Sequence, residues 1–340
     1  MSAELLAVRA ARRRPRIRHA RALTVLVALL IGAFFLRVLG GDYTITFPDF
    51  VRILDGAQLP GATYILMESK LPRAVLGVLV GVAFGVSGAI YQRTLRNPLA
   101  SPDIVGVSVG ASAAAVFGIV VLHASGVALS VAAVVGAIGT AAAVRLVTGR
   151  DGGYRLVLVG VTAAAGLTAV IQYLFTRADE YDAQLALQWL TGSLSGADWP
   201  TVQVLALCLL VLLPLVASRA RAQEALELGS DTALSLGVPR HGVDGILLLA
   251  TVLTALAVAA AGPVAFVAFV AGPVARALNG GRTTLLGAAL VGAVVMVGSD
   301  YVAAYALPDT RLPAGVVTGA LGAPFLLWLL TRSRTSRRSS

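Results

Sequence analysis

The feature that most limits the fold of this chain is a series of apolar runs, each about as long as a lipid bilayer is thick. A helix needs about 20 apolar residues to cross a hydrocarbon layer of about 30 Å. Ten runs of this kind occur, over residues 22–39, 71–91, 104–122, 126–147, 156–176, 200–217, 245–261, 264–278, 284–305 and 313–331. Because only helices or closed barrels satisfy every backbone polar group inside lipid, the pattern predicts an all-α membrane protein with ten spans.

Composition supports the same class. The 340 residues are 57% hydrophobic and 13% charged, and a soluble protein carries about 25% charged residues. A soluble enzyme is therefore excluded. The net charge of +10 could suggest nucleic acid, but the arginines lie at the ends of apolar runs, where membrane orientation explains them better.

The distribution of charge predicts the orientation. Seven arginines lie between Arg9 and Arg21, ahead of the first run, and arginines recur in every second loop, whereas the alternate loops are acidic. By the positive-inside rule both termini are cytoplasmic. We expect a basic segment at 1–21, a permease domain at 22–331 and a basic tail at 332–340. The run over 23–39 is long for a secretory signal and lacks a cleavage motif, so we expect it to be retained.

The chain carries few groups that could do chemistry. Cys208 is the only cysteine, the three histidines are far apart in sequence, and we expect no metal site. Lys70 is the only lysine and no G-x-x-x-x-G-K-[ST] pattern occurs, so the chain should not hydrolyse ATP itself. Ionisable residues such as Asp300 and Arg276 fall near the ends of spans, so a buried charge relay is not expected, and energy must come from a partner.

Glycines recur at small-x-x-x-small spacing in the second span, at Gly77, Gly81, Gly85 and then Gly88. Such faces let helices approach closely where lipid provides no hydrophobic drive for association. We interpret them as packing surfaces.

The connection over 218–244 is more than a solvated loop. Residues 223–228 predict a short helix that ends at Gly229, and 231–236 predict a second that stops at Gly237 before Pro239. Helices this short are unstable alone, so they need a groove in a partner. The alternative is a loop that rests on its own bundle.

Five segments in order resemble one transporter family. They are L-P-R (71–73), R-N-P-L-A-S-P-D-I-V-G-V-S-V-G-A (96–111), E-A-L-E-L-G-S-D-T-A-L-S-L-G-V (224–238), A-G-P-V-A-F-V-A-F-V-A-G-P-V-A-R (261–276) and R-L-P-A-G-V-V-T-G-A-L-G-A-P-F (311–325). Together they cover about residues 70–330 and resemble the iron-siderophore and vitamin B12 permease family of ABC importers. The resemblance implies the type II importer bundle, in which two ten-span permeases work with two ATPase subunits and an outer binding protein.

The resemblance also implies roles for particular residues. The ATPase-coupling set is Glu224, Leu226, Leu228, Gly229, Ala233, Leu236 and Gly237. The binding-protein docking set is Lys70, Arg73 and Arg311, for which interfacial snorkelling is the alternative. The cytoplasmic gate is Asn97, Leu99, Gly153 and Tyr154, for which a purely structural turn is the alternative. The pathway should be lined by the fifth, eighth and tenth spans and a short outer helix near Trp189.

Two departures from the family pattern are informative. Val274 follows Pro273 where the family commonly has Pro-His, as in the second subunit of heterodimeric ferric-catecholate siderophore permeases. Ala304 replaces an expected docking arginine, a charge that Arg311 could supply. The resemblance therefore favours a heterodimer with a related permease.

The expected function is a non-catalytic permease subunit that imports a ferric siderophore across a bacterial cytoplasmic membrane. It should bind no cofactor, because ATP and Mg²⁺ would belong to the partner ATPase. Import of cobalamin or haem is the sibling alternative. An ion-coupled carrier would require membrane-buried charges or interrupted helices paired in two inverted halves, and the sequence shows no such pair. A membrane scaffold would leave the 224–238 segment unexplained.

Overall fold

The computed structural model describes residues 3–149, 154–238, 240–307 and 310–337, which are helical and contain no strand. The elements are α1 (Ala3–Leu39), α2 (Phe47–Leu54), α3 (Ala62–Tyr64), the π-helix η1 (Ile65–Lys70), α4 (Leu71–Thr94), the 3₁₀ helix η2 (Pro102–Val105), α5 (Val107–Leu122), α6 (Gly126–Thr148), α7 (Tyr154–Phe175), α8 (Glu180–Leu190), α9 (Trp199–Ser218), α10 (Ala220–Glu227), α11 (Ser230–Ser235), α12 (Arg240–Ala261), α13 (Val267–Leu278), α14 (Leu285–Tyr305) and α15 (Ala314–Arg337).

Ten of these segments match the ten predicted spans. Within the described residues, seven are long and apolar enough to cross a membrane, namely α1, the continuous α3–η1–α4 segment, α6, α7, α9, α12 and α14. The other three, α5, α13 and α15, are shorter apolar helices. The chain is thus an all-helical, multi-pass membrane protein. The main difference from prediction is α1, which is already helical from Ala3, well before the predicted start of the first span.

Helix α4 lies at the centre of the bundle, and its glycines explain why. A Cβ added at Gly81 or Gly85 would overlap the backbone of α14, and one added at Gly88 would overlap the backbone of α13. Side chains at these positions would force the helices apart, so the small-residue face allows direct backbone contact. The predicted packing surface is confirmed, and it explains why α4 is largely buried.

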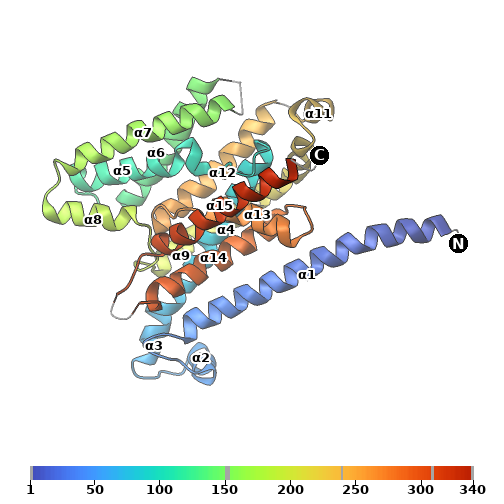
Figure 1. The fold of residues 1–340 in the computed structure, drawn as a ribbon. Coiled ribbons are helices and arrows are strands. Elements are labelled where there is room, and N and C mark those ends of the chain that lie inside the picture. The colour runs from blue at the N-terminus through green and yellow to red at the C-terminus, as the bar shows by residue number, and fades with distance from the viewer. Residues whose placement is uncertain (1–2, 150–153, 239, 308–309, 338–340) are drawn as a thin grey trace.

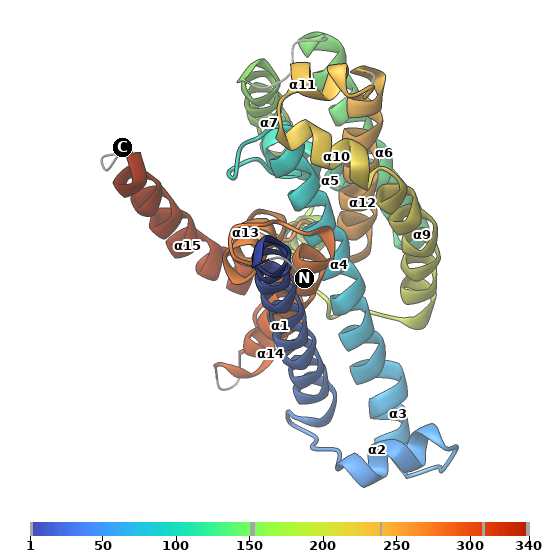
Figure 2. The same cartoon turned by 90° about the vertical axis from the view of Figure 1, so that its right-hand side faces the viewer.

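The two ends of the bundle differ in structure. Figure 2 shows α10 and α11 at one end and α2 with α3 at the other. Figure 1 shows α5–α8 on one side of the molecule and α1 on the opposite edge, with the N-terminal part of α1 extending away from the other helices. We refer below to the α10–α11 end and the α2–α3 end.

Helix α2 was not predicted, because eight residues are too short to register as a span. Its start nevertheless has a local signal: Thr46 caps the helix by accepting from the Asp49 backbone N–H, and Pro48 occupies the first turn. Phe50 and Ile53 are buried, and Phe50 packs edge-on against Phe35 of α1. The helix therefore lies across the end of α1.

Candidate functional site

The connection predicted to contact a partner forms two short helices, α10 and α11, as expected from its glycines. Gly229 adopts a φ of 118° and Gly237 a φ of 85°, which are left-handed values that glycine tolerates at no steric cost. The Leu228 and Leu236 side chains are 66% and 61% exposed, although both are large and apolar. These two leucines give this end of the molecule an apolar surface that the chain itself does not cover.

Two other members of the predicted coupling set face inward. Leu226 is 4% exposed and Ala233 is 1% exposed, and both belong to the main hydrophobic core. The expectation that their side chains contact a partner is therefore corrected: they hold α10 and α11 onto the bundle. Glu224, by contrast, is exposed.

An ion pair ties α10 to the central helix. Arg93, in the last turn of α4, places Nε 2.8 Å from Glu227 Oε1. The same guanidinium donates through Nη2 to the carbonyl of Thr283, in the connection between α13 and α14. Arg93 therefore links α10, α4 and the start of α14, so a displacement of α10 would reach the core of the bundle directly.

The predicted gate residues after α4 lie in a tight turn. Asn97 Oδ1 accepts from the Leu99 backbone N–H at 2.9 Å, and the Asn97 carbonyl accepts from Ala100 N–H at 3.0 Å. Of the second pair, Gly153 lies outside the described residues, and Tyr154 is the first residue of α7. The gate assignment remains a prediction.

A cavity of about 720 Å³ runs from this turn towards the α12–α13 connection. Its walls come from the elements expected to line the pathway: α7, α8, α13 and α15, together with α5 and residues 263–266. The full lining is Leu99, Ser101, Asp103, Ile104, Ser108, Val109, Ser112, Thr168, Ile171, Leu190, Pro263, Val264, Ala265, Phe266, Phe269 and Leu326. Leu99 thus connects the predicted gate to the cavity.

The α12–α13 connection is irregular backbone in the interior of the bundle. Phe266 has a φ of 66°, a left-handed value that is uncommon for a bulky residue, and its ring lies 6.1 Å from that of Phe269 in an edge-to-face arrangement. Ser193 N–H donates to the Ala261 carbonyl at 2.8 Å, which fixes the connection to the α8–α9 loop. Non-helical backbone at membrane depth is tolerated where it is buried in protein or lines a cavity, and this segment does the latter.

Asp103 is the acidic residue among the cavity-lining side chains. It lies in η2, just before α5, and its Oδ1 accepts a hydrogen bond from the Ser108 hydroxyl. Burial raises the pKa of the Asp103 carboxyl, and the Ser108 hydrogen bond opposes that shift. No residue named above as part of the cavity wall is Lys, Arg or His.

The docking residues predicted before α4 are held inside the chain. Lys70 is 5% exposed, and its Nζ donates to the carbonyls of Gly40 and Tyr43, both at 2.6 Å. This corrects the expectation of a free docking charge at Lys70, because reaching a partner would cost both hydrogen bonds and the surrounding packing.

Arg73 belongs to a buried cluster that the sequence did not predict. Its Nη2 lies 2.8 Å from Asp300 Oδ1, and Arg37 Nε lies 2.6 Å from Asp300 Oδ2. Asp300 is 1% exposed and Arg37 4% exposed, whereas Arg73 retains 15%. The cluster lies where α1 ends and α4 begins, so Asp300 is near the end of a span as expected, but the sequence analysis did not predict that it would be buried between two cations. Arg37 inside an otherwise apolar run was the signal that could have revealed it.

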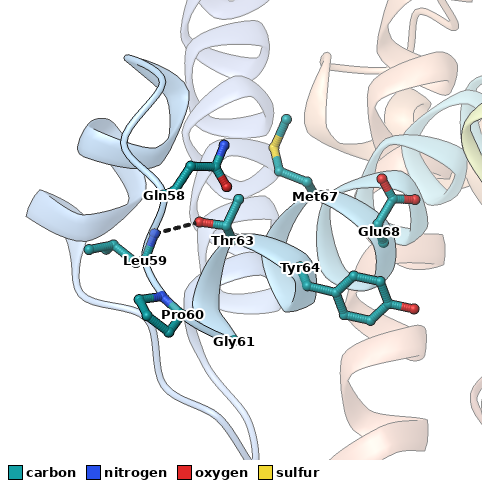
Figure 3. A pocket seen from close by; sticks show the side chains of 8 residues that line it. All are labelled: Gln58, Leu59, Pro60, Gly61, Thr63, Tyr64, Met67 and Glu68. Atoms are coloured by element: carbon teal, nitrogen blue, oxygen red, sulfur yellow. Dashed lines mark hydrogen bonds between the residues drawn. The ribbon is translucent and has the colours of Figure 1, made fainter.

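Arg311 is the predicted docking residue that stands at the surface. Its side chain is 75% exposed and pairs with Asp42, which is 68% exposed, at 2.6 Å. A second hollow, of about 390 Å³, lies near the α3–η1 segment. Figure 3 shows Tyr64 and Glu68 on one side of it and Leu59 on the other, where the Leu59 N–H donates to Thr63 Oγ1. This end thus offers a solvent-facing surface of mixed charge.

Within the residues that the structure describes, no group of three or more His, Cys, Asp or Glu side chains could hold a metal ion. His123 pairs with Asp182 at 3.1 Å, and His19 contacts Asn279 at 3.1 Å. These histidines have protein partners at separate places in the fold.

Comparison with known proteins identifies the architecture. A model of the FecCD transport family matches residues 28–332. The chain belongs to the FecCD transport family. This FecCD chain is 36% identical over 312 residues to the ferric enterobactin transport system permease protein FepG of Escherichia coli K12, covering 91% of this chain and 94% of the relative. It is 38% identical over 275 residues to the Fe(3+) dicitrate transport system permease protein FecD of the same strain, covering 80% and 86%.

A solved structure agrees with this placement. A metal-chelate type ABC transporter in an inward-facing conformation superposes with a TM-score of 0.82 at 25% identity, covering 92% of this FecCD chain and 99% of the other. The resemblance inferred from the sequence segments is therefore confirmed for the family and for the fold. The roles of individual residues remain predictions.

Proposed function

We propose that this chain is the non-catalytic permease subunit of an ATP-driven importer that carries a ferric siderophore across a bacterial cytoplasmic membrane. The names of the two FecCD relatives, which refer to ferric enterobactin and Fe(3+) dicitrate, support an iron chelate as the substrate. The cavity between α5, α7, α8, α13 and α15 provides the path for it.

The observation that carries the proposal is the pair of exposed leucines, Leu228 and Leu236, that directly follow α10 and α11. Two large apolar side chains at the water-facing end of a membrane protein are costly unless a partner buries them. The helices that precede them are too short to be stable alone, yet Arg93 anchors α10 to α4. A surface of this kind suits a docking ATPase whose closure moves α10 as a lever.

The two ends of the bundle suggest where the other subunits of the importer bind. The α10–α11 end faces the cytosol, where two ATPase subunits bind ATP and Mg²⁺, and this chain binds neither. The α2–α3 end faces outward, where the exposed Arg311 meets acidic groups of a binding protein. A related permease completes the pathway as a heterodimer.

The test is ATP-driven uptake by the reconstituted importer. Replacement Leu236→Asp places a charge in the apolar contact, so we expect the ATPase to co-purify poorly and iron uptake to fall at least about tenfold, because a charge buried without a partner opposes binding. Uptake that follows an imposed ion gradient and not ATP would instead favour an ion-coupled carrier.

The matched control is Leu307→Asp. Leu307 is 49% exposed in the connection after α14, at the opposite end of the molecule. The same substitution there should leave co-purification of the ATPase unchanged. Equal loss of the ATPase in both variants would point to misfolding, and normal uptake by Leu236→Asp would contradict the proposed coupling surface.

A further inference from the structure

Helix α13 contains a proline that removes one of the helix's own hydrogen bonds. Pro273 lies inside this helix, which runs over Val267–Leu278. In a regular α-helix the N–H of residue 273 would donate to the carbonyl of Phe269, four residues earlier, and proline has no N–H to donate. The Phe269 carbonyl therefore lacks its usual helical donor, in a part of α13 that is buried.

A side chain from another helix supplies the missing donor. Gln92, in the last turn of α4, donates through Nε2 to the Phe269 carbonyl at 2.9 Å, and Gln92 is buried. Gly272 makes room for the amide, because a Cβ at Gly272 would overlap Gln92 Oε1. At this carbonyl, a hydrogen bond within α13 is thus replaced by a hydrogen bond between α13 and α4.

The carbonyl belongs to a residue of the cavity wall. Phe269 lines the cavity, and its ring packs edge-on against the rings of Phe266 and Phe325, with ring centres 6.1 Å and 6.4 Å apart. The part of α13 before Pro273 is therefore joined to the aromatic wall on one side and to α4 on the other. It has one bond fewer to the part of α13 that follows Pro273.

The same turn of α4 also contacts the coupling helices. Arg93, the residue after Gln92, pairs with Glu227 of α10 and donates to the Thr283 carbonyl. Adjacent residues of a helix point about 100° apart, so one turn of α4 can contact α10 and α13 at the same time. A displacement of α10 that moves the end of α4 therefore acts on the cavity wall through the neighbouring side chain.

We propose that Gln92 is a positioning residue for transport: its amide passes the movement of α4 to the Phe269 wall of the cavity, and Pro273 frees the carbonyl that receives it. This inference rests on the proposed function and assigns a role in it to one hydrogen bond between helices. The alternative is that Gln92 only stabilises α13, by filling the gap in hydrogen bonding that Pro273 leaves. Contact alone does not distinguish the two roles, so the test measures coupling and stability separately.

The test is hydrogen exchange of the backbone over residues 267–272 in the complete importer in lipid nanodiscs, with and without ATP. In wild type, ATP should change the exchange rate severalfold, because α10 moves α4 and α4 moves this segment. Gln92→Met keeps the approximate length of the side chain but has no N–H donor. Exchange without ATP should become about fivefold faster, which corresponds to a lost hydrogen bond worth about 1 kcal/mol, and the response to ATP should disappear.

A second substitution, Pro273→Ala, separates coupling from stability. It restores an N–H donor for the Phe269 carbonyl, so the double variant Gln92→Met/Pro273→Ala should regain the wild-type exchange rate without ATP. Its response to ATP should stay absent, because the restored bond lies within α13 and does not reach α4. Pro273→Ala alone keeps the Gln92 donor, and a carbonyl can accept two hydrogen bonds, so its response should be normal. A double variant that regains both properties would show that Gln92 only stabilises α13, and would overturn the proposal.

Ser87→Ala is the matched control. Ser87 of α4 is buried and donates through Oγ to the Ala250 carbonyl of α12 at 2.7 Å, so the variant removes another buried bond between α4 and a neighbouring helix. No residue named above as part of the cavity wall belongs to α12. The response of residues 267–272 to ATP should therefore remain. Its loss in Ser87→Ala would mean that any weakening of the packing of α4 has this effect, and would refute a specific role of Gln92.

Iron uptake tests the proposed function by itself. The probe is radioiron, supplied to proteoliposomes with the binding protein as ferric enterobactin or as Fe(3+) dicitrate, and Gln92→Met should hydrolyse severalfold more ATP per iron imported. ATP-driven import by wild type, with equal exchange responses in wild type and Gln92→Met, would retain the function and refute the role of Gln92. If wild type imported no iron from either probe, yet only the Gln92 variants lost the exchange response, the proposed function would be contradicted and the link between α4 and α13 supported.

Discussion

At the scale of single residues, the strongest constraint on how the helices pack is the cluster of Arg37, Asp300 and Arg73. The Asp300 carboxylate on α14 accepts from two guanidinium groups, that of Arg37 on α1 and that of Arg73 on α4. A buried charge is tolerated only when it is paired and hydrogen-bonded, so the three side chains depend on each other. Their common position fixes how the edge helix α1 attaches to the core.

The cluster leads to a prediction about stability. Asp300→Asn removes the shared carboxylate and leaves two buried cations facing each other, so we expect a loss of about 3 kcal/mol in the free energy of unfolding. Thermal unfolding in detergent would measure it. Asp42→Asn breaks the exposed pair with Arg311 and should cost no more than about 0.5 kcal/mol, because water screens that pair. Similar losses in both variants would contradict this account of the cluster.

At the scale of elements, α4 organises the bundle because it lacks side chains where its neighbours touch it. Gly81 and Gly85 meet α14, and Gly88 meets α13. Association in lipid depends on packing and not on the hydrophobic effect, so the loss of such contacts is not compensated. This is why the most buried long span is also rich in glycine.

Gly85→Leu tests this packing. The new side chain would overlap the backbone near Ala288, so the expected destabilisation is about 2 kcal/mol or more, with reduced yield of folded protein. Gly139→Leu is the control, because a Cβ at Gly139 of α6 meets no atom within 4 Å. Size-exclusion profiles and melting temperatures would compare them. If Gly85→Leu folded as well as Gly139→Leu, direct contact between α4 and α14 would not limit stability.

At the scale of the whole molecule, the coupling helices, the central helix and the cavity form one connected path. The exposed Leu228 and Leu236 directly follow α10 and α11. Arg93 connects α10 with α4, and the turn after α4 leads to Leu99 and Asp103 in the cavity wall. A movement of α10 can therefore reach the cavity through a continuous set of contacts. Rigid-body rocking of packed helices is a common way of transmitting such a movement.

Glu227→Gln tests this connection. Glu227 is 45% exposed, so its ion pair contributes little stability, and the variant should fold and bind its ATPase normally. We expect the number of ATP molecules hydrolysed per iron imported to rise severalfold, because α10 no longer moves α4. Glu180→Gln, an exposed acid at the start of α8, should leave the ratio unchanged. An unaltered ratio in Glu227→Gln would show that coupling does not pass through Arg93.

What the sequence determined by itself was the number and type of the spans, the glycine face of α4 and the two short helices of α10 and α11. These features depend on local hydropathy, residue size and helix-ending glycines, which are readable without knowing what lies nearby. The family resemblance followed from segments of the same kind.

What only the tertiary structure decided was which side chains are free. Lys70, Leu226 and Ala233 lie in segments that resemble contact surfaces, yet all three are buried in the folded chain. Asp300 finds two cations more than two hundred residues away, and Asp103 gains its place in a cavity only when α7, α13 and α15 close around it. Whether a side chain is buried or ion-paired depends on its neighbours in space. The pattern of residue types along the chain does not specify those neighbours.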